Sequence, residues 1–285
     1  MFRGRIVKAL SGFYYVEDNN KIIECRARGK FRKDEIKPLV GDFVEYQDGY
    51  IMKLLPRKNF LVRPPICNID QVLIVNSCKE PDFSSMLLDK FLLVVEHLNI
   101  EPIIVLSKMD LDDGSVESYV NDYRKAGYKV YEISSKDNCG IDEIKAIFKD
   151  KVTVITGQSG VGKSSLLNAL DIELNLETNN ISKALGRGKH TTRHVELIKM
   201  YNGYIGDTPG FSSLELDMSP EQLAIAYHDF KEYSQECKFR GCLHDKEPDC
   251  AIKKAVDDGM ISKERYEHYL LNLQEVKRKE ERKYG

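Results

Sequence analysis

The chain has 285 residues, a formal net charge of −2, 42% hydrophobic residues and 31% charged residues. This length suits two or three domains with apolar cores, and no apolar run approaches the roughly 20 residues of a membrane-spanning helix. The chain begins without the apolar stretch of a signal peptide, so we expect a cytoplasmic protein with no membrane segment. Nothing in the composition indicates an obligate dimer, and we expect a monomer.

The first 63 residues are basic, with 14 Lys and Arg against 8 Asp and Glu, whereas the rest of the chain has 29 against 37. Short β-type runs separated by turns predict a small barrel of the OB type, in a domain that spans residues 1–65. Five cations and one aromatic residue lie between Arg26 and Lys33, and OB-type barrels bind single-stranded nucleic acid with such a combination. A solvated cationic face is the alternative interpretation. The expected strands are 4–10, 13–16, 21–25 and 42–46.

From residue 66 to residue 218, apolar runs of strand length alternate with helical patterns. This alternation predicts an α/β domain built on a parallel sheet with helices on both faces. The expected strands are 72–75, 103–106, 129–133, 152–155, 195–199 and 204–206, and the expected helices are 87–98, 116–126, 141–148 and one that starts at residue 163.

Two polar segments at strand ends in this domain resemble guanine-binding elements. Ser107-Lys108-Met109-Asp110 fits the pattern N-K-x-D with Ser in place of Asn. Asp110 is expected to accept hydrogen bonds from guanine N1 and N2, and Lys108 is expected to lie along the base. Such a site discriminates strongly against adenine. Ser134-Ser135-Lys136 resembles the S-A-K element, in which the Ser135 N–H would meet guanine O6. A polar turn is the alternative interpretation of the first segment.

The segment Gly157-Gln158-Ser159-Gly160-Val161-Gly162-Lys163-Ser164 has the spacing G-x-x-x-x-G-K-[ST] of a phosphate-binding loop, between an apolar strand and a helix. Its glycines let backbone N–H groups turn toward phosphate oxygens. Lys163 is expected to reach the β- and γ-phosphates and the Ser164 hydroxyl to ligate Mg²⁺, with Ser165 also at the nucleotide. A glycine-rich turn with a stray Lys is the alternative.

Two further segments complete the expected nucleotide site. Asp207-Thr208-Pro209-Gly210 fits D-x-x-G at a strand end, where Asp207 would hold Mg²⁺ through water and the Gly210 N–H would sense the γ-phosphate. The next residue is Phe211, which cannot orient a water molecule as the Gln of many GTPases does. His190 is therefore the nearest candidate for that role, and Thr191 or Thr192 should close on Mg²⁺ and the γ-phosphate. A structural or RNA-contact role for His190 is the alternative.

Near the C-terminus, a domain 219–285 carries a cluster of thiol and imidazole side chains: Cys237, Cys242, His244 and Cys250. Three Cys and one His at this spacing predict a closed, structural zinc site. Unliganded cytosolic Cys is the alternative. His228 and His268 lie outside the spacing and are expected to be ordinary surface or helix residues. The chain ends in a long charged helix, expected at 262–282 and interpreted as solvated.

In this chain the guanine elements precede the phosphate loop, the reverse of the usual order, which indicates a circular permutation. With the basic barrel and the Cys/His cluster, this order makes the chain resemble the RsgA (YjeQ/YloQ) family of circularly permuted GTPases over nearly its whole length. The resemblance implies a bacterial GTPase of small-ribosomal-subunit biogenesis, with ribosomal RNA as partner, GTP and GDP as ligands, Mg²⁺, one zinc ion and a catalytic His at residue 190.

The fold class expected is thus a circularly permuted α/β P-loop GTPase with an OB-type barrel before it and a helical zinc module after it. The function expected is GTP hydrolysis during late maturation of the small (30S) subunit, slow without a partner and stimulated by the subunit. Two other functions stay open: an RNA-binding protein for which GTP is only a regulatory ligand, and an ATP-dependent P-loop enzyme such as a kinase. Asp110 argues against the latter.

Overall fold

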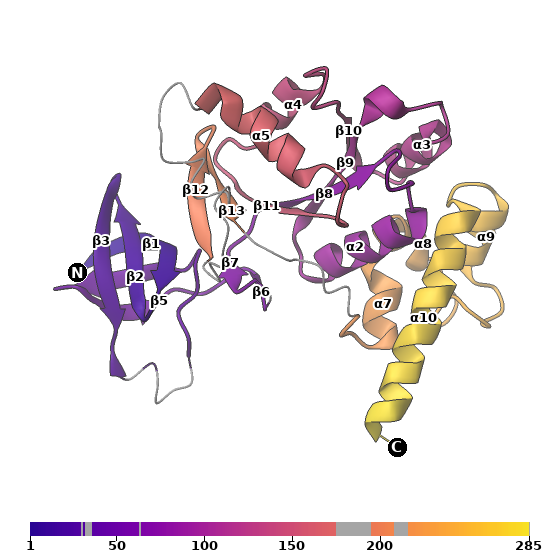
Figure 1. Cartoon of the computed structure of the whole chain (residues 1–285). Coiled ribbons are helices and arrows are strands. Elements are labelled where there is room, and N and C mark those ends of the chain that lie inside the picture. Colours follow the sequence, from indigo (N-terminus) through magenta and orange to yellow (C-terminus); the bar gives the residue numbers. More distant parts are fainter. Residues whose placement is uncertain (30, 32–35, 63, 175–194, 208–215, 285) are drawn as a thin grey trace. The chain divides into compact units, whose positions relative to one another are not determined.

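The computed structural model describes residues 1–29, 31, 36–62, 64–174, 195–207 and 216–284. The chain divides into two compact units, whose elements are labelled in Figure 1. The first unit comprises Met1–Leu73, Asn138–Thr156 and Lys163–Ser213, and the second comprises Ile74–Asp137, Gly157–Gly162 and Leu214–Gly285. Among the described residues, no helix is long and apolar enough to cross a membrane.

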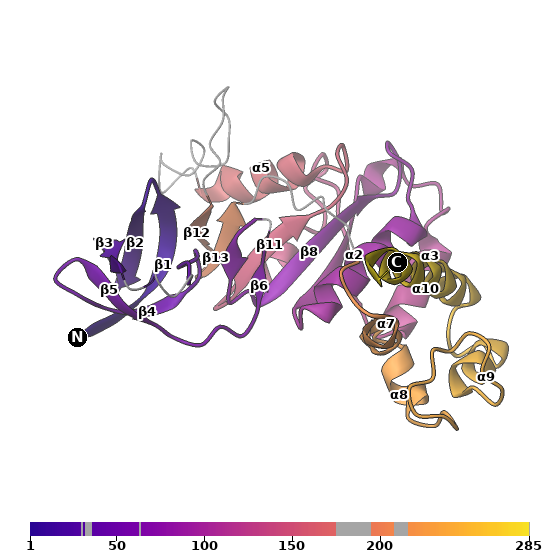
Figure 2. The ribbon, with the colours of Figure 1, turned by 90° about the horizontal axis from the view of Figure 1, so that it is seen from below.

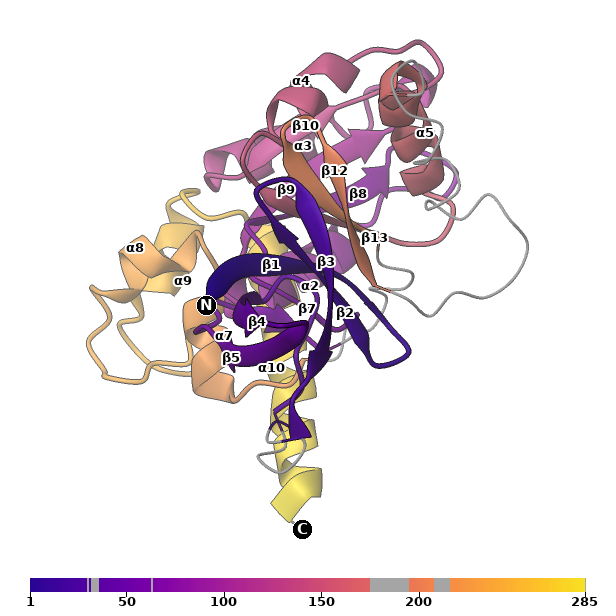
Figure 3. The ribbon, with the colours of Figure 1, turned by 90° about the vertical axis from the view of Figure 1, so that its left-hand side faces the viewer.

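A five-stranded barrel opens the first unit (Figure 3). The strands are arranged in the order β1-β2-β3-β5-β4, and β1 also pairs with β4, which closes the barrel. Alternate side chains such as Ile6, Val16, Val44 and Ile51 are fully buried inside it. This arrangement confirms the expected OB-type barrel. The strands are β1 (Phe2–Leu10), β2 (Phe13–Asp18), β3 (Lys21–Ala27), β4 (Phe43–Gln47) and β5 (Tyr50–Leu54), of which the sequence pattern did not predict β5.

The first unit continues with a second group of strands and two helices. Strand β13 pairs parallel with β11 but antiparallel with β12, so the sheet is mixed rather than fully parallel as expected. The cause is a two-residue turn: Tyr201 and Asn202 both have positive φ, which makes β12 and β13 a tight hairpin. The elements are β6 (Phe60–Leu61), β7 (Ile66–Cys67), α4 (Ile141–Ala146), β11 (Val152–Thr156), α5 (Lys163–Leu174), β12 (Glu196–Met200) and β13 (Gly203–Asp207).

In the second unit, three strands lie in the order β10-β9-β8, with β10 parallel to β9. Every residue of β8 is buried, as expected for a strand covered on both faces. Helix α2 begins after Ser84, whose hydroxyl accepts a hydrogen bond from the Leu87 N–H, and packs on β9. The elements are β8 (Gln71–Ser77), which starts in the first unit, α2 (Ser85–His97), β9 (Glu101–Ser107), η1 (Met109–Leu111), α3 (Glu117–Lys125) and β10 (Lys129–Glu132).

The C-terminal part of the second unit is helical. Figure 2, in which α10 is seen nearly end-on, shows α7, α8 and α9 gathered on one side of it. Their apolar side chains share one core with the ligand-type residues Cys242 and Cys250, and the fully buried Tyr269 and Phe230 are among its largest members. Helix α10 packs against α2 as well. The helices are α7 (Pro220–Ala226), α8 (Phe230–Ser234), α9 (Ala251–Asp257) and α10 (Lys263–Tyr284).

Candidate functional site

The glycine loop of the second unit has a shape that only glycine permits at its first position. Gly157 has a φ of 142°, and a Cβ there would lie 2.1 Å from the Val75 carbonyl oxygen. Gly160 and Gly162 also have positive φ. Gly157 and Val161 are buried, whereas Gln158, Ser159 and Gly160 are exposed. The loop is therefore anchored at its two ends and presents its middle to solvent, as a phosphate-binding loop must.

Ser107, which replaces the usual Asn of the guanine motif, contacts this loop directly. Its buried hydroxyl lies 2.5 Å from the Val161 carbonyl oxygen and 3.1 Å from the Asn76 carbonyl oxygen. Since a hydroxyl has one proton, it donates to the nearer carbonyl, that of Val161. A Cβ on Gly162 would lie 3.5 Å from the same hydroxyl. The guanine motif and the phosphate loop are thus tied by one side chain, a role that sequence reasoning did not foresee.

The two guanine elements meet at the ends of the parallel strands β9 and β10. The Ser134 hydroxyl lies 3.1 Å from one oxygen of Asp110 and 2.9 Å from an oxygen of Asp137, and the Lys136 ammonium lies 3.6 Å from the other oxygen of Asp110. The Met109 N–H donates to the Ile133 carbonyl, which joins the two segments through the backbone as well. Asp110 therefore lies beside the S-A-K-like element, as its expected role at guanine requires.

Lys108 lies between these contacts. Its backbone is left-handed, with a φ of 59°, and its ammonium group donates to the Glu80 carbonyl. Its own carbonyl accepts from the Cys78 thiol at 2.8 Å. The long aliphatic part of this side chain is the part expected along a base.

The first unit carries the other part of the expected site. Lys163 is the first residue of α5, and burial lowers the pKa of its ammonium group. Ser164 and Ser165 follow it and are exposed. Strand β13, parallel to β11, ends at Asp207, so the chain leaves both strands at the same edge of the sheet. His190, Thr191, Thr192 and Gly210 lie outside the described residues, as does Phe211.

The thiol and imidazole cluster converges in the second unit. The ligand atoms of Cys237, Cys242, His244 and Cys250 all lie within 4.8 Å of one another. The sulfur of Cys250 lies 3.9 Å from that of Cys237 and 3.8 Å from that of Cys242, and the Nδ1 of His244 lies 3.4 Å from the same sulfur. Zinc–sulfur bonds of about 2.3 Å in a tetrahedron place sulfurs about 3.8 Å apart. The donor set and its spacing therefore fit a closed tetrahedral zinc site.

The protonation of these ligands fits a metal as well. Burial lowers the pKa of His244, so its ring is neutral at neutral pH, the form that ligates metals. The ring also hydrogen-bonds the Ala224 backbone, which orients it. Burial raises the pKa of the Cys242 thiol to about 12, so a strong cation is needed to hold it as thiolate.

The loop around the cluster is fixed by further hydrogen bonds. The Glu247 carboxylate accepts from the N–H groups of Leu243 and Asp245, each at 2.9 Å. The Tyr266 hydroxyl donates to the His244 carbonyl at 2.7 Å, which ties the loop to α10. These contacts position the loop that carries the ligands.

Comparison with known proteins decides the family. The family model described as RsgA GTPase matches residues 54–217, and the one described as RsgA N-terminal domain matches residues 3–51. A third model, described as 50S ribosome-binding GTPase, matches residues 152–283. The small ribosomal subunit biogenesis GTPase RsgA of Bacillus subtilis is 54% identical over 97% of this chain and 98% of its own length. The chain belongs to the RsgA family of small ribosomal subunit biogenesis GTPases.

Other RsgA-family proteins agree along the whole chain. The RsgA of Halalkalibacterium halodurans is 52% identical over 100% of both chains. The crystal structure of YloQ, a circularly permuted GTPase, has a TM-score of 0.84 and 48% identity, covering 98% of this chain and 96% of that one. YjeQ from Thermotoga maritima has a TM-score of 0.83 and 39% identity, covering 96% and 98%. The expectation of a permuted RsgA-family GTPase is therefore confirmed, and a GTPase binds GTP.

The surroundings of His268 differ from those of an exposed residue on a solvated helix. His268 lies on helix α10 as expected, but it is buried, and its Nδ1 is 2.6 Å from a carboxylate oxygen of Asp89 on α2. The same carboxylate pairs with the fully buried Arg265. The charged C-terminal helix is therefore solvated only in part, because Arg265 and His268 turn toward the protein.

Proposed function

We propose that this chain hydrolyses GTP to GDP and phosphate during late maturation of the small (30S) ribosomal subunit, and that the subunit stimulates turnover. The single observation that supports this best is the tie between Ser107 and the Val161 carbonyl, because it joins a guanine element to a phosphate loop. Asp110 beside Ser134 supports guanine as the base.

The roles of the phosphate-side residues follow from their chemistry. Lys163 would neutralise charge on the β- and γ-phosphates, and its lowered pKa reflects a buried ammonium group that an anion would stabilise. The Ser164 hydroxyl would ligate Mg²⁺ directly and Asp207 would hold it through water. Mg²⁺, when bound, neutralises charge that develops on the phosphate oxygens.

We propose that His190 orients the attacking water, because Phe211 stands where many GTPases have Gln. Thr191 or Thr192 would contact Mg²⁺ and the γ-phosphate. Hydrolysis by the chain alone is expected to be slow, because Phe211 cannot position water.

The remaining parts of the chain would serve the encounter with the subunit. We propose three domains, which span residues 1–65, 66–218 and 219–285. The first would bind ribosomal RNA through its basic barrel. The last would be stabilised by one zinc ion held by Cys237, Cys242, His244 and Cys250. The protein would act as a monomer in the cytoplasm.

A titration of GTP hydrolysis with purified small subunits tests the proposal. Wild type should release phosphate faster as subunits are added, and His190→Ala should lose that stimulation while its GTP affinity, measured with a fluorescent nucleotide, is unchanged. The matched control is His97→Ala, a half-buried histidine at the end of α2. Equal rates with and without subunits would contradict the proposal.

One observation keeps a second function open. Because Phe211 cannot position water, GTP could act as a regulatory ligand of an RNA-binding protein that hydrolyses little. GTP binding without phosphate release at any subunit concentration would favour that function.

A further inference from the structure

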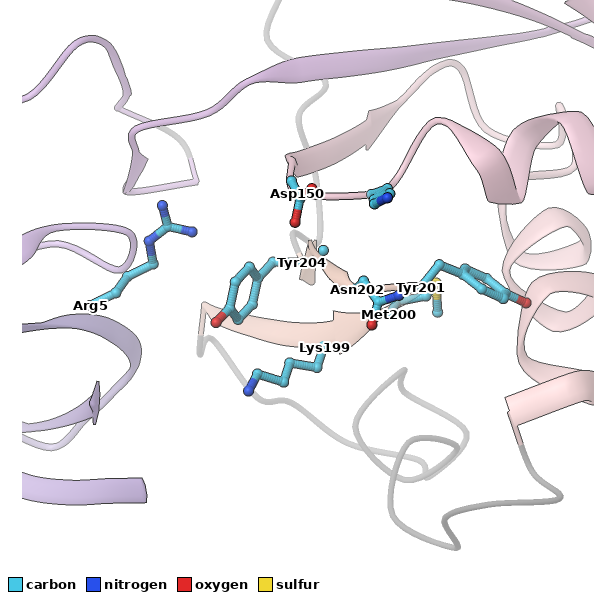
Figure 4. A pocket seen from close by; sticks show the side chains of 9 residues that line it. Arg5, Asp150, Lys199, Met200, Tyr201, Asn202 and Tyr204 are labelled. Carbon is cyan, nitrogen blue, oxygen red and sulfur yellow. The ribbon is translucent and has the colours of Figure 1, made fainter. Parts of the chain in front are cut away.

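A cavity of about 670 Å³ in the first unit lies between strand β1 of the barrel and the β12–β13 hairpin, and none of the guanine or phosphate elements lines it (Figure 4). Its charged lining consists of Arg5, Lys149, Lys199 and Asp150, so cations outnumber the acidic group. Figure 4 shows Arg5 extending from the barrel toward the ring of Tyr204. A volume of this size accommodates a ligand as large as a nucleotide.

Two aromatic rings hold the Arg5 guanidinium in place. Its central carbon lies 4.4 Å from the centre of the Phe43 ring and 5.2 Å from that of Tyr204. Contacts of this kind with aromatic rings use no hydrogen-bond donor, so they leave the N–H groups of the guanidinium for other partners. Arg5 is therefore oriented without the use of its hydrogen-bond donors.

Among the described residues, no side chain or backbone group accepts a hydrogen bond from the Arg5 guanidinium, and its Nε is buried without a partner. Glu17, which faces Arg5 in the β1–β2 register, is engaged elsewhere: it accepts from the Tyr204 hydroxyl at 2.7 Å and pairs with Lys199. Burial lowers the pKa of Arg5, as expected for a charge that is desolvated without an adjacent ion pair. Arg5 is half-buried, and its buried Nε is a costly donor unless an acceptor reaches it.

We propose that Arg5 binds a phosphate of the RNA backbone in this cavity, with Lys149 as a second cation at its rim. The inference rests on the proposed function, in which the barrel binds ribosomal RNA. A phosphate fits better than a base because the charged lining is mostly cationic and the guanidinium has an unused N–H donor. The fork of N–H groups that remains matches two phosphate oxygens. The contact therefore carries no sequence preference and adds to salt-dependent affinity.

The test is the salt dependence of RNA binding by the full chain. A fluorescent single-stranded oligouridylate is titrated at several KCl concentrations with wild type, Arg5→Gln and Lys149→Gln. Arg5→Gln should weaken binding about tenfold at low salt. It should also reduce the slope of log affinity against log salt by about 0.7, which corresponds to one phosphate contact. The matched control is Lys53→Gln, which removes an exposed cation from strand β5 of the same barrel.

The outcomes separate the possibilities. A slope for Arg5→Gln equal to that of Lys53→Gln would overturn the site. The site would also be overturned if inorganic phosphate or GTP in the millimolar range removed the difference in RNA affinity between wild type and Arg5→Gln, since the ligand would then be a free anion. Failure of wild type to bind any RNA would overturn both the site and RNA binding by the barrel. Lys149 lies on an exposed loop, so Lys149→Gln should fold normally and lower the slope even if Arg5→Gln does not fold.

Discussion

Ser107 shows how a substitution in a motif is absorbed by its surroundings. Asn has a longer side chain than Ser, but the Ser107 hydroxyl still reaches the Val161 carbonyl directly. The backbone turns immediately after this carbonyl, at Gly162, which has a positive φ. A Cβ at Gly162 would lie 3.5 Å from the hydroxyl, in ordinary contact, so the close approach depends on the backbone rather than on added space. The serine therefore contacts the phosphate loop, and its expected role at the base stays a prediction.

Removal of this hydroxyl should weaken nucleotide binding. Ser107→Ala leaves the Val161 carbonyl without its donor, and an unsatisfied buried carbonyl costs about 1–3 kcal/mol. We expect the melting temperature without nucleotide to fall by about 2–10 °C. GTP and GDP affinities in titrations with fluorescent nucleotides should also fall by about tenfold, because the loop is no longer held in its binding conformation. Ser107→Thr keeps the hydroxyl and serves as the control. Wild-type affinity in Ser107→Ala would show that the tie has no part in binding.

At the scale of elements, helices α2 and α10 are joined by buried charges. The Arg265 guanidinium donates to both oxygens of Asp229 at 2.9 Å and also pairs with Asp89, whose second oxygen faces His268. Buried ion pairs stabilise little in themselves but are very costly to break on one side only. The network therefore specifies how α10 packs on α2 more than how strongly it does so.

Glu96, at the end of α2, should make the stability of the protein depend on pH. Burial raises its pKa from 4.5 to about 8, and its carboxyl lies 3.2 Å from the Tyr128 hydroxyl and 3.7 Å from His228 Nδ1. Between these two pH values the folded chain binds a proton that the unfolded chain releases. The stability that this proton contributes is complete below pH 4.5 and is lost as the pH rises through 8.

Glu96→Gln mimics the protonated carboxyl and should remove this loss. We expect the free energy of unfolding of the variant to vary less between pH 5 and pH 8.5, and to exceed that of wild type at pH 8.5 by on the order of 3 kcal/mol. Urea denaturation at each pH measures it. Glu117→Gln, an exposed change on α3, is the control, and parallel pH profiles for all three proteins would contradict the assignment.

The sequence predicted most elements, because local patterns decided them, but it missed those that depend on distant partners. The hairpin of β12 and β13 replaced an expected parallel connection, and Gly203 is needed there because a Cβ would lie 1.9 Å from the Phe148 carbonyl oxygen. Such close packing is invisible in a sequence. Arg265 illustrates the same limit: its partners Asp89 and Asp229 are remote in the chain, so a charged helix was interpreted as solvated.

The candidate sites divide in the same way. Chain spacing alone predicted the phosphate loop and the metal cluster, because both are local constellations of fixed residue types. The tie at Ser107 and the unused donors of Arg5 could not be predicted, since each depends on segments that meet only in the fold. Across the whole molecule, sequence motifs therefore predict the residues of a site, whereas only the tertiary structure shows which neighbouring residues contact them.

The cluster of Cys237, Cys242, His244 and Cys250 lies in the core that also contains α7 to α10, so its metal should matter for the second unit as a whole. Without a cation, two buried thiols, one half-buried thiol and a neutral imidazole contribute little, and the loop between α8 and α9 is held by hydrogen bonds such as those of Glu247 and of the Tyr266 hydroxyl on α10. Structural zinc adds its binding free energy to folding.

Cys250→Ser should therefore lose zinc and much of the stability of this unit. We expect about one zinc per chain by atomic emission in wild type and well below one in the variant. A loss of unfolding free energy on the order of 5 kcal/mol would lower the melting temperature by about 10–20 °C. Amide hydrogen exchange should become faster in the segment 237–257 and then in α10, while the amides of the barrel stay protected. Cys139→Ser, an exposed cysteine outside the cluster, should keep both metal and stability. A zinc-free wild type, or equal melting of the two variants, would mean that the apolar core alone holds these helices together.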